Sequence, residues 1–228
     1  MSVSFNRIPA NIRVPLFYAE IDNSGAGYFA QNKRTLLIGQ KLSAGSAAAN
    51  TPILVGSVDN AKALFGAGSM LARMHSFHRK QDPIGEVWAI AVADAAAGAQ
   101  ATGTITVTGT ATAAGTIPLY IAGQNVPVGV SAADTATVIA AAINTAINAA
   151  TELPVTSSVA AGVVTLTCKW KGLTGNDISV LDSFRGSAGG EAVPAGVALA
   201  YSNSNFLSGG ATNPTLSNTA ITAMGDEE

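Results

Sequence analysis

Residues whose types and spacing could do chemistry are concentrated in one stretch, LFGAGSMLARMHSFHRK (64–80). A glycine-rich turn at 66–69 leads into a helical pattern that carries both histidines of the chain, His75 and His78. Amide groups at the start of a helix can attract a phosphate, and two histidines three residues apart on a helix can reach one metal ion. The stretch therefore raises two hypotheses, a nucleotide site and a metal site.

The neighbouring residues favour neither hypothesis. A Walker loop follows a strand and has a lysine before its serine, whereas Gly68 precedes Ser69 here and the turn follows an expected helix. Leu71 stands where a Rossmann loop has its third glycine. A metal site needs further ligands, and no spacing requires Asp82 or Glu86 to supply them. We predict a tight helix–helix corner, histidines that are solvated or lie at an interface, and no metal or cofactor.

Cys168, the single cysteine of the chain, is the remaining candidate nucleophile. It alternates with Val164, Leu166 and Trp170 on one face of an expected strand. A thiol on the apolar face of a strand is expected to be buried and inert. Since the carboxylates are scattered and no motif pairs them, we predict that the chain is not an enzyme.

Composition excludes several other classes of protein. The chain has 228 residues, of which 48% are hydrophobic and only 11% charged, with a net charge of −2. Such a weakly charged surface suits proteins packed against their own copies, although small residues are also tolerated in β-rich domains. The charge disfavours nucleic acid as a main partner. The sequence has no apolar run of about 20 residues and no signal-peptide core, which predicts a cytoplasmic origin without membrane insertion.

An α/β unit is predicted around the glycine-rich corner. Apolar runs predict buried strands at 34–40 and 86–93, and the sequence supplies no further strand for this unit. Between them, a first helix is capped at Asp59 and stops at Gly66, and a second begins after Ser69. Four residues form the expected apolar face of the second helix: Met70, Leu71, Met74 and Phe77.

Beyond residue 99 the hydrophobic pattern changes to the period of two that is typical of strands. A helix within 131–150 interrupts it, with Ile139, Ile143 and Ile147 on one face, and a hairpin turns near Gly162. The predicted fold class is α/β (α+β), a partial core with an inserted β-rich domain that carries one long helix. The predicted domains are an extended arm (1–30), the first part of the core (31–98), the inserted domain (99–208) and the return to the core (209–228).

Several of these stretches, in this order, resemble the Mu-like contractile phage tail sheath proteins: NIRVPLFYAEIDNSGAG, LLIGQ, LFGAGSMLARM, VWAIAV, the region from TGTITVTGT to GLTGNDI, and FLSGGATNP. The resemblance implies a structural subunit without active site or cofactor. Its copies would self-assemble as rings or a helix around the tail tube, meet the baseplate, and contract to drive the tube through the cell envelope. It also implies assembly in the host cytoplasm and a place in the virion. Because family members are considerably longer, it further implies a truncated gene or a fragment.

The same resemblance implies a role for the proline-containing arm, since extended terminal segments of sheaths add strands to neighbouring subunits. The arm residues that match are Phe5, Ile8, Ile12, Val14, Leu16, Phe17 and Tyr18. Two other interpretations remain open. The Ala/Gly/Thr-rich β region is compatible with a surface adhesion module, and the corner at 66–69 with a nucleotide-binding enzyme.

Overall fold

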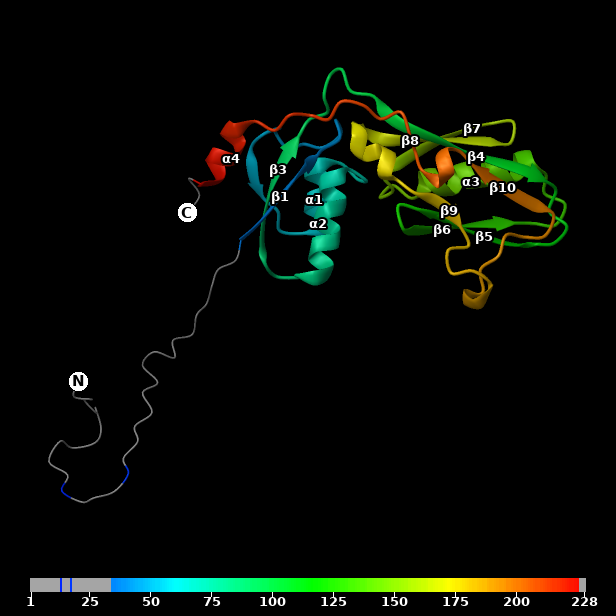
Figure 1. Cartoon of the computed structure of the whole chain (residues 1–228), viewed down its shortest axis with the longest axis horizontal. Coiled ribbons are helices and arrows are strands. Elements are labelled where there is room, and N and C mark those ends of the chain that lie inside the picture. Colours follow the sequence, from blue (N-terminus) through cyan, green and yellow to red (C-terminus); the bar gives the residue numbers. More distant parts are fainter. Residues whose placement is uncertain (1–12, 14–16, 18–33, 226–228) are drawn as a thin grey trace. The chain divides into compact units, whose positions relative to one another are not determined.

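The computed structural model describes Arg13, Phe17 and residues 34–225 (Figure 1). Every element below belongs to the unit Arg34–Glu228, which separates from the unit Met1–Lys33. Within the described residues, the strands form three sheets of three, four and three strands. Together with the helices they confirm the predicted α+β fold class.

The first sheet contains both strands predicted for this unit and one strand that was not predicted. β3 (Glu86–Val92) lies in the middle, parallel to β1 (Arg34–Gln40) and antiparallel to β2 (Pro52–Leu54). The expectation that the sequence supplies no further strand is therefore wrong. Three residues are too few to show an alternating pattern, and the proline that starts β2 is tolerated because the strand lies at an edge.

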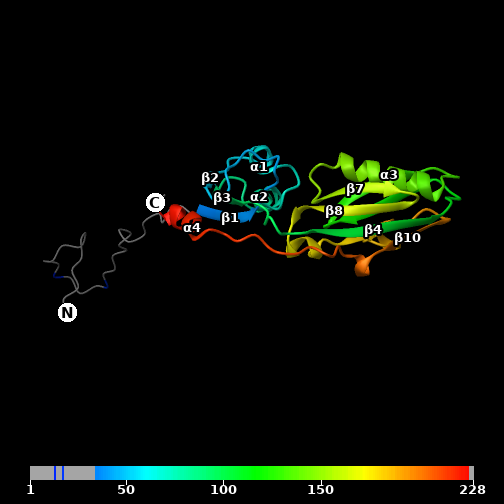
Figure 2. The same ribbon diagram turned by 90° about the horizontal axis from the view of Figure 1, so that it is seen from above.

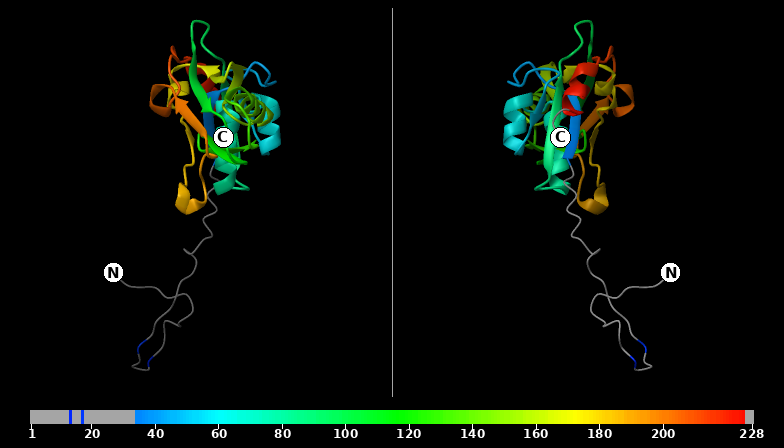
Figure 3. Two further views of the ribbon diagram at one scale, coloured as in Figure 1. Left: turned by 90° about the vertical axis from the view of Figure 1, so that its right-hand side faces the viewer. Right: turned by 90° about the vertical axis from the view of Figure 1, so that its left-hand side faces the viewer.

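Two helices connect the parallel strands β1 and β3, as a parallel pair requires. These helices, α1 (Val58–Phe65) and α2 (Met70–Gln81), cover one face of the sheet (Figure 2). The last helix, α4 (Asn218–Gly225), contacts β2 and lies on the other side of the sheet (Figure 3). Residues from both ends of the described chain thus build this layer.

Serine side chains begin both connecting helices. Ser57 accepts a hydrogen bond from the backbone N–H of Asn60 at 3.1 Å, so the predicted cap at Asp59 is wrong. A cap needs extended backbone, which Ser57 has, whereas Asp59 already lies in the first helical turn, where its charge suits the helix dipole. The predicted cap Ser69 is confirmed, since its hydroxyl accepts from the N–H of Ala72 at 3.1 Å.

The buried face of α2 differs from the predicted one. Leu71, Ala72 and His75 are buried, while Met74 is 36% and Phe77 54% exposed. The helix is therefore rotated by about one residue, roughly 100°, relative to the expectation. The hydrophobic cluster between α2, α1 and the sheet contains several alanines, and Ala72 is one of them. An alanine contributes little to an apolar pattern, so the sequence did not mark Ala72 as buried.

Most of the remaining chain forms a β-sandwich that carries the long helix. One sheet has the order β10-β4-β8-β7 and the other the order β6-β5-β9 (Figure 1). The helix α3 (Ala136–Ala149) contacts strands of both sheets. The strands are β4 (Gln100–Gly109), β5 (Gly115–Ile121), β6 (Gln124–Val130), β7 (Val155–Ala160), β8 (Val163–Lys171), β9 (Val180–Asp182) and β10 (Val197–Tyr201), and short 3₁₀ helices cover Leu173–Asp177, Ser187–Gly189 and Asn203–Asn205.

The core of the sandwich follows the sequence pattern closely. Ile139, Ile143 and Ile147 are buried on α3, as their spacing predicts. The alternating residues of β8 are buried on the same core: Val164, Leu166, Cys168 and Trp170. The second hairpin turns at Ala161–Gly162, the predicted position.

One edge of the four-stranded sheet is covered by a side chain of α3. The Nδ2 atom of Asn148 donates to the backbone oxygen of Ser157 on β7 at 2.9 Å, and its Oδ1 atom accepts from the N–H of Ser157 at 3.0 Å. Exposed strand edges otherwise invite pairing with other chains. Asn148 therefore ties the helix to the edge strand and satisfies part of its backbone.

The sandwich is joined to the first layer by two segments that run side by side. Ala99 in the outgoing segment forms an antiparallel bridge with Ala211 in the returning segment, and Thr102 forms another with Ser208. The returning segment then leads to α4. Both crossings therefore lie at one end of the sandwich.

Candidate functional site: the polar junction

The glycine corner (66–69) packs directly against the sandwich. Gly68 has a φ of 77°, and a Cβ atom placed there would lie 2.6 Å from Nζ of Lys169 on β8. The Lys169 ammonium donates to the backbone oxygens of Thr151, at 2.7 Å, and Ala67, at 3.4 Å. The glycine thus permits a close approach of two backbones, and a lysine from the other layer is bonded to the corner.

The backbone N–H of Ala72, at the start of α2, is already hydrogen-bonded within the protein. Ser69 is fully buried, and its hydroxyl already satisfies the N–H of Ala72. Burial lowers the pKa of Lys169, and the nearby guanidinium of Arg73 lowers it further. This arrangement explains the two glycines and the serine as parts of a packed corner.

Gln40, at the end of β1, makes a second contact across the junction. Its side chain is 3% exposed, and Nε2 donates to Oδ1 of Asp94 at 2.7 Å and to the backbone oxygen of Lys171 at 2.6 Å. The other carboxylate oxygen of Asp94 accepts from the N–H of Lys171 at 3.2 Å. Buried polar groups need such partners, so Gln40 and Asp94 link β1, the segment after β3 and β8 in one network.

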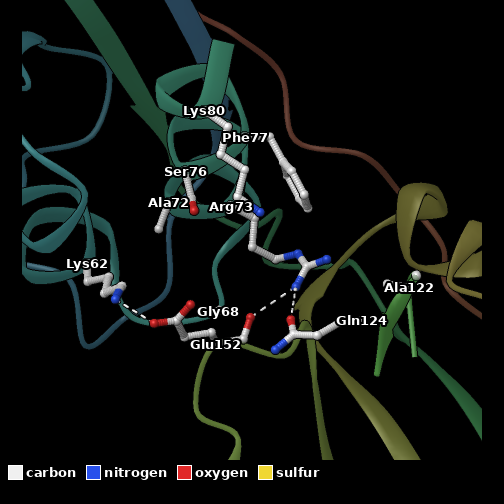
Figure 4. Close-up of a pocket in the computed structure, with 11 residues that line it drawn as sticks. Lys62, Gly68, Ala72, Arg73, Ser76, Phe77, Lys80, Ala122, Gln124 and Glu152 are labelled. Atoms are coloured by element: carbon white, nitrogen blue, oxygen red, sulfur yellow. Dashed lines mark hydrogen bonds and ion pairs between the residues drawn. The ribbon is translucent and has the colours of Figure 1, made fainter. Parts of the chain in front are cut away.

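A third contact surrounds a cavity of about 360 Å³, which we call the α2 cavity. Lys62 of α1 forms an ion pair of 2.5 Å with Glu152, which lies between α3 and β7. Arg73 of α2 donates to the backbone oxygen of Glu152 at 3.0 Å and to Oε1 of Gln124 at 3.4 Å (Figure 4). The charged and aromatic side chains that line it are Lys62, Arg73, Phe77, Lys80 and Glu152.

Phe77 stands at this cavity between two cations. The guanidinium carbon of Arg73 lies 5.6 Å and the ammonium of Lys80 4.8 Å from the centroid of its ring. Both distances suit a cation–π interaction. With three cations and one carboxylate in its lining, the α2 cavity carries a net positive charge and an accessible aromatic ring.

The two histidines do not share an environment. His75 is fully buried and neither of its ring nitrogens has a hydrogen-bond partner, so the expectation of a solvated or interface histidine is wrong for this residue. Burial lowers the pKa of His75, the backbone of Val55 opposes this effect, and the nearby charge of Arg79 adds to it. His78 Nε2 lies 3.9 Å from Oδ2 of Asp82. In the described part of the chain, no three histidine, cysteine, aspartate or glutamate side chains are grouped as metal ligands would be.

Cys168 has the environment that the strand pattern predicts. Its side chain is fully buried in the sandwich core. This burial raises the pKa of the thiol to about 11. Since the thiolate is the nucleophilic form, the thiol of the folded protein is unreactive at neutral pH.

Of the seven arm residues, Phe17 is the one that the structure describes, and its side chain is 92% exposed. The other six lie outside the described residues: Phe5, Ile8, Ile12, Val14, Leu16 and Tyr18. Among the helices that the structure describes, none combines the length and the apolar character required to span a membrane.

Comparison with known proteins agrees with this architecture. Residues 96–200 match the family model of the phage tail sheath protein beta-sandwich domain. Over 229 aligned residues the chain is 41% identical to the Mu-like prophage FluMu tail sheath protein of Haemophilus influenzae (strain ATCC 51907 / DSM 11121 / KW20 / Rd), an alignment that covers 100% of this chain and 46% of the relative. The chain is thus similar to a phage tail sheath protein along its whole length.

This similarity confirms the resemblance deduced from the sequence. The chain spans about half the length of the sheath protein that it matches. The matched β-sandwich model includes β4 to β8, α3 and β9. It therefore covers the sandwich side of the junction, including Glu152 and Lys169.

Sequence reasoning missed the junction residues themselves. Gln40 and Asp94 come from separate strand ends, and Lys169 lies on the polar face of β8. One signal was available, because lysines are scarce in this chain and yet two flank Trp170 in one strand. Which carbonyl groups they would meet depends on tertiary contacts, with Thr151 and the distant Ala67 for Lys169 and with the distant Ala96 for Lys171.

Proposed function

We propose that this chain contributes a structural subunit, or part of one, to a contractile phage or prophage tail sheath. Copies of the subunit assemble around the tail tube and contract to drive the tube through the cell envelope. The similarity to a tail sheath protein over the whole chain carries this proposal. The matched β-sandwich model is in keeping with it.

Within this proposal, the sandwich (99–208) is a domain inserted into a core built from 31–98 and 209–228. Its two connections lie side by side, since Ala99 bridges Ala211. After the second connection the chain returns to the first sheet, where α4 contacts β2. Both connections to the core leave the sandwich at the same end. The opposite end of the sandwich is therefore free to change in sequence and length without disturbing the core.

We further propose that the arm (1–30) adds a strand to a neighbouring subunit, with Phe5, Ile8, Ile12, Val14, Leu16, Phe17 and Tyr18 as its contact residues. Main-chain hydrogen bonds would supply strength and alternate side chains would fill pockets on the neighbour. Contraction then consists of a rearrangement of contacts in a metastable array, while the arms keep the subunits connected. The proposed partners are other copies, the tail tube and the baseplate, with assembly in the host cytoplasm before incorporation into the virion.

Immunogold electron microscopy of particles released after prophage induction tests the proposal, with an antibody raised against the whole chain. We expect gold along the sheath of extended and contracted tails. Labelling of the host cell surface without labelling of tails would refute the sheath proposal and favour an adhesion module. Labelling confined to soluble protein would refute both.

The arm is tested separately by Phe17→Asp combined with Leu16→Asp. A buried charge at the subunit contact would reduce the number of sheathed tails strongly, because an unpaired charge is costly in an interface. Ser24→Asp adds a charge in the same segment and is expected to leave assembly unchanged. Normal sheaths in the double variant would contradict the assigned arm contact.

A further inference from the structure

Phe184 is displayed on an ordered loop of the sandwich. The loop follows β9, and its Phe184 side chain is 70% exposed. The backbone N–H of Ser183 donates to the oxygen of Pro118 at 3.0 Å, and the N–H of Glu191 donates to the oxygen of Gly186 at 3.0 Å. The ring is therefore exposed to solvent on a loop that is held by one hydrogen bond to β5 and one within the loop.

Acidic side chains lie near the ring of Phe184. The ring itself packs on Tyr120, with a distance of 5.7 Å between the two ring centroids. The Tyr120 hydroxyl donates to Oε1 of Glu191, and the N–H of Arg185 donates to its other oxygen at 2.8 Å. The Tyr120 hydrogen bond holds the pKa of Glu191 below its usual range, so the carboxylate is ionised. The Phe184 loop is defined here as residues 182–191, so it includes Asp182 at the end of β9, whose carboxylate accepts from the Tyr201 hydroxyl at 2.7 Å. With Asp182 and Glu191 against the single side chain of Arg185, these residues carry a net charge of −1.

The α2 cavity has the complementary character. Its lining carries three cations and one carboxylate beside the half-exposed ring of Phe77. No residue of the Phe184 loop lines it, so the loop does not fill the cavity of its own copy. A volume of about 360 Å³ lies near the lower limit of ordinary ligand pockets, which suits one aromatic side chain better than a folded segment.

We propose that the Phe184 loop of one copy docks at the α2 cavity of a second copy. The opposite charges of the two surfaces orient the contact, and the aromatic rings and the flanking cations provide its centre. Because two different surfaces meet, the contact is head-to-tail, and repetition of it produces a ring or an open helix rather than a closed dimer. This inference rests on the proposed assembly of copies into a sheath.

Site-specific photo-crosslinking in assembled tails tests the contact. A photoreactive phenylalanine analogue replaces Phe77, or in a second preparation Met74, and the crosslinked peptides are identified by mass spectrometry. We expect dimers that join the cavity to the peptide containing residues 182–191. The same analogue at Ile84, which is 95% exposed beyond the end of α2, is the control and is expected to give no crosslink to that peptide.

A crosslink from both cavity positions to another region, or none in assembled tails, would overturn the docking proposal. The sheath proposal would stand in that case, because immunogold labelling tests it independently. A chain absent from tails overturns both.

Phe184→Ala is the second test. It is expected to lower the crosslink yield from position 77 by about tenfold or more, as truncation of a central aromatic anchor does, or to prevent assembly while the thermal midpoint of the chain is unchanged. Val159→Ala, a substitution of a partly exposed residue on β7, is expected to do neither. An unchanged yield in Phe184→Ala tails would refute the proposal.

Discussion

Replacing Gly68 by alanine tests whether the glycine corner is packed against the sandwich. Gly68 and Gly123 have nearly the same φ, 77° and 75°. A Cβ atom at Gly68 would collide with the backbone oxygen of Leu153 and approach Nζ of Lys169, whereas a Cβ at Gly123 meets nothing within 4 Å. Gly123→Ala is therefore a matched control that changes the backbone strain without the contact.

The two substitutions differ in their expected cost. Alanine in the left-handed region costs about 1–2 kcal/mol in either position. At Gly68 the lysine end can move aside, but the carbonyl of Leu153 cannot, and overpacking of this kind adds about 1–3 kcal/mol. We expect Gly68→Ala to lower the free energy of unfolding by about 2–5 kcal/mol and Gly123→Ala by about 1–2 kcal/mol.

Urea unfolding followed by tryptophan fluorescence measures this difference. Trp88 lies in the first sheet and Trp170 in the sandwich, so the signal reports on both layers. With a urea dependence of about 1–3 kcal/mol per molar, the midpoint of Gly68→Ala is expected to fall clearly below that of Gly123→Ala. Equal midpoints for the two variants would refute the packed corner.

Further predictions concern the sandwich. Ile143→Ala is expected to lower the free energy of unfolding by about 2–5 kcal/mol, whereas Val138→Ala, on the exposed side of the same helix, should change it by about 0.5 kcal/mol or less in urea unfolding. Asn148→Ala removes two solvent-exposed hydrogen bonds to the β7 edge, whose backbone groups water can then satisfy, and is expected to lower the thermal midpoint modestly, with a loss of about 0.5–1.5 kcal/mol. Because the Cys168 pKa is raised to about 11 from 9.0, the unfolded state loses this proton first as the pH rises. The stability of the wild type should therefore fall between pH 9 and 11 more steeply than that of Cys168→Ala, and parallel pH profiles would contradict the burial.

The sequence predicted best where local pattern and burial coincide. The alternation of apolar residues in β8 predicts that Cys168 and Trp170 are buried in the core. The spacing of four residues between Ile139, Ile143 and Ile147 likewise predicts the buried face of α3. These elements are amphipathic, so their buried side can be deduced without knowing their partner.

Prediction from the sequence failed where the packing partner of a helix decides which of its residues are buried. The buried face of α2 turned out to include Ala72 and His75 rather than Phe77, because the space offered by α1 and the sheet, and not the apolar pattern, selects the residues that fit. The cap lies at Ser57 and not at Asp59 for a different, local reason, since both residue types suit the position and only the backbone conformation distinguishes them.

By itself the sequence determined the α+β class, the order of the longer strands and helices and the resemblance to sheath proteins, since periodicity and ordered motifs are properties of neighbouring residues. Tertiary structure alone decided the polar junction, where Gln40, Asp94 and Lys169 meet backbone atoms from distant segments. It also decided the charge of the α2 cavity. The physical reason is that a hydrogen bond or an ion pair depends on distances of about 3 Å between groups, and the packing of the two layers sets those distances.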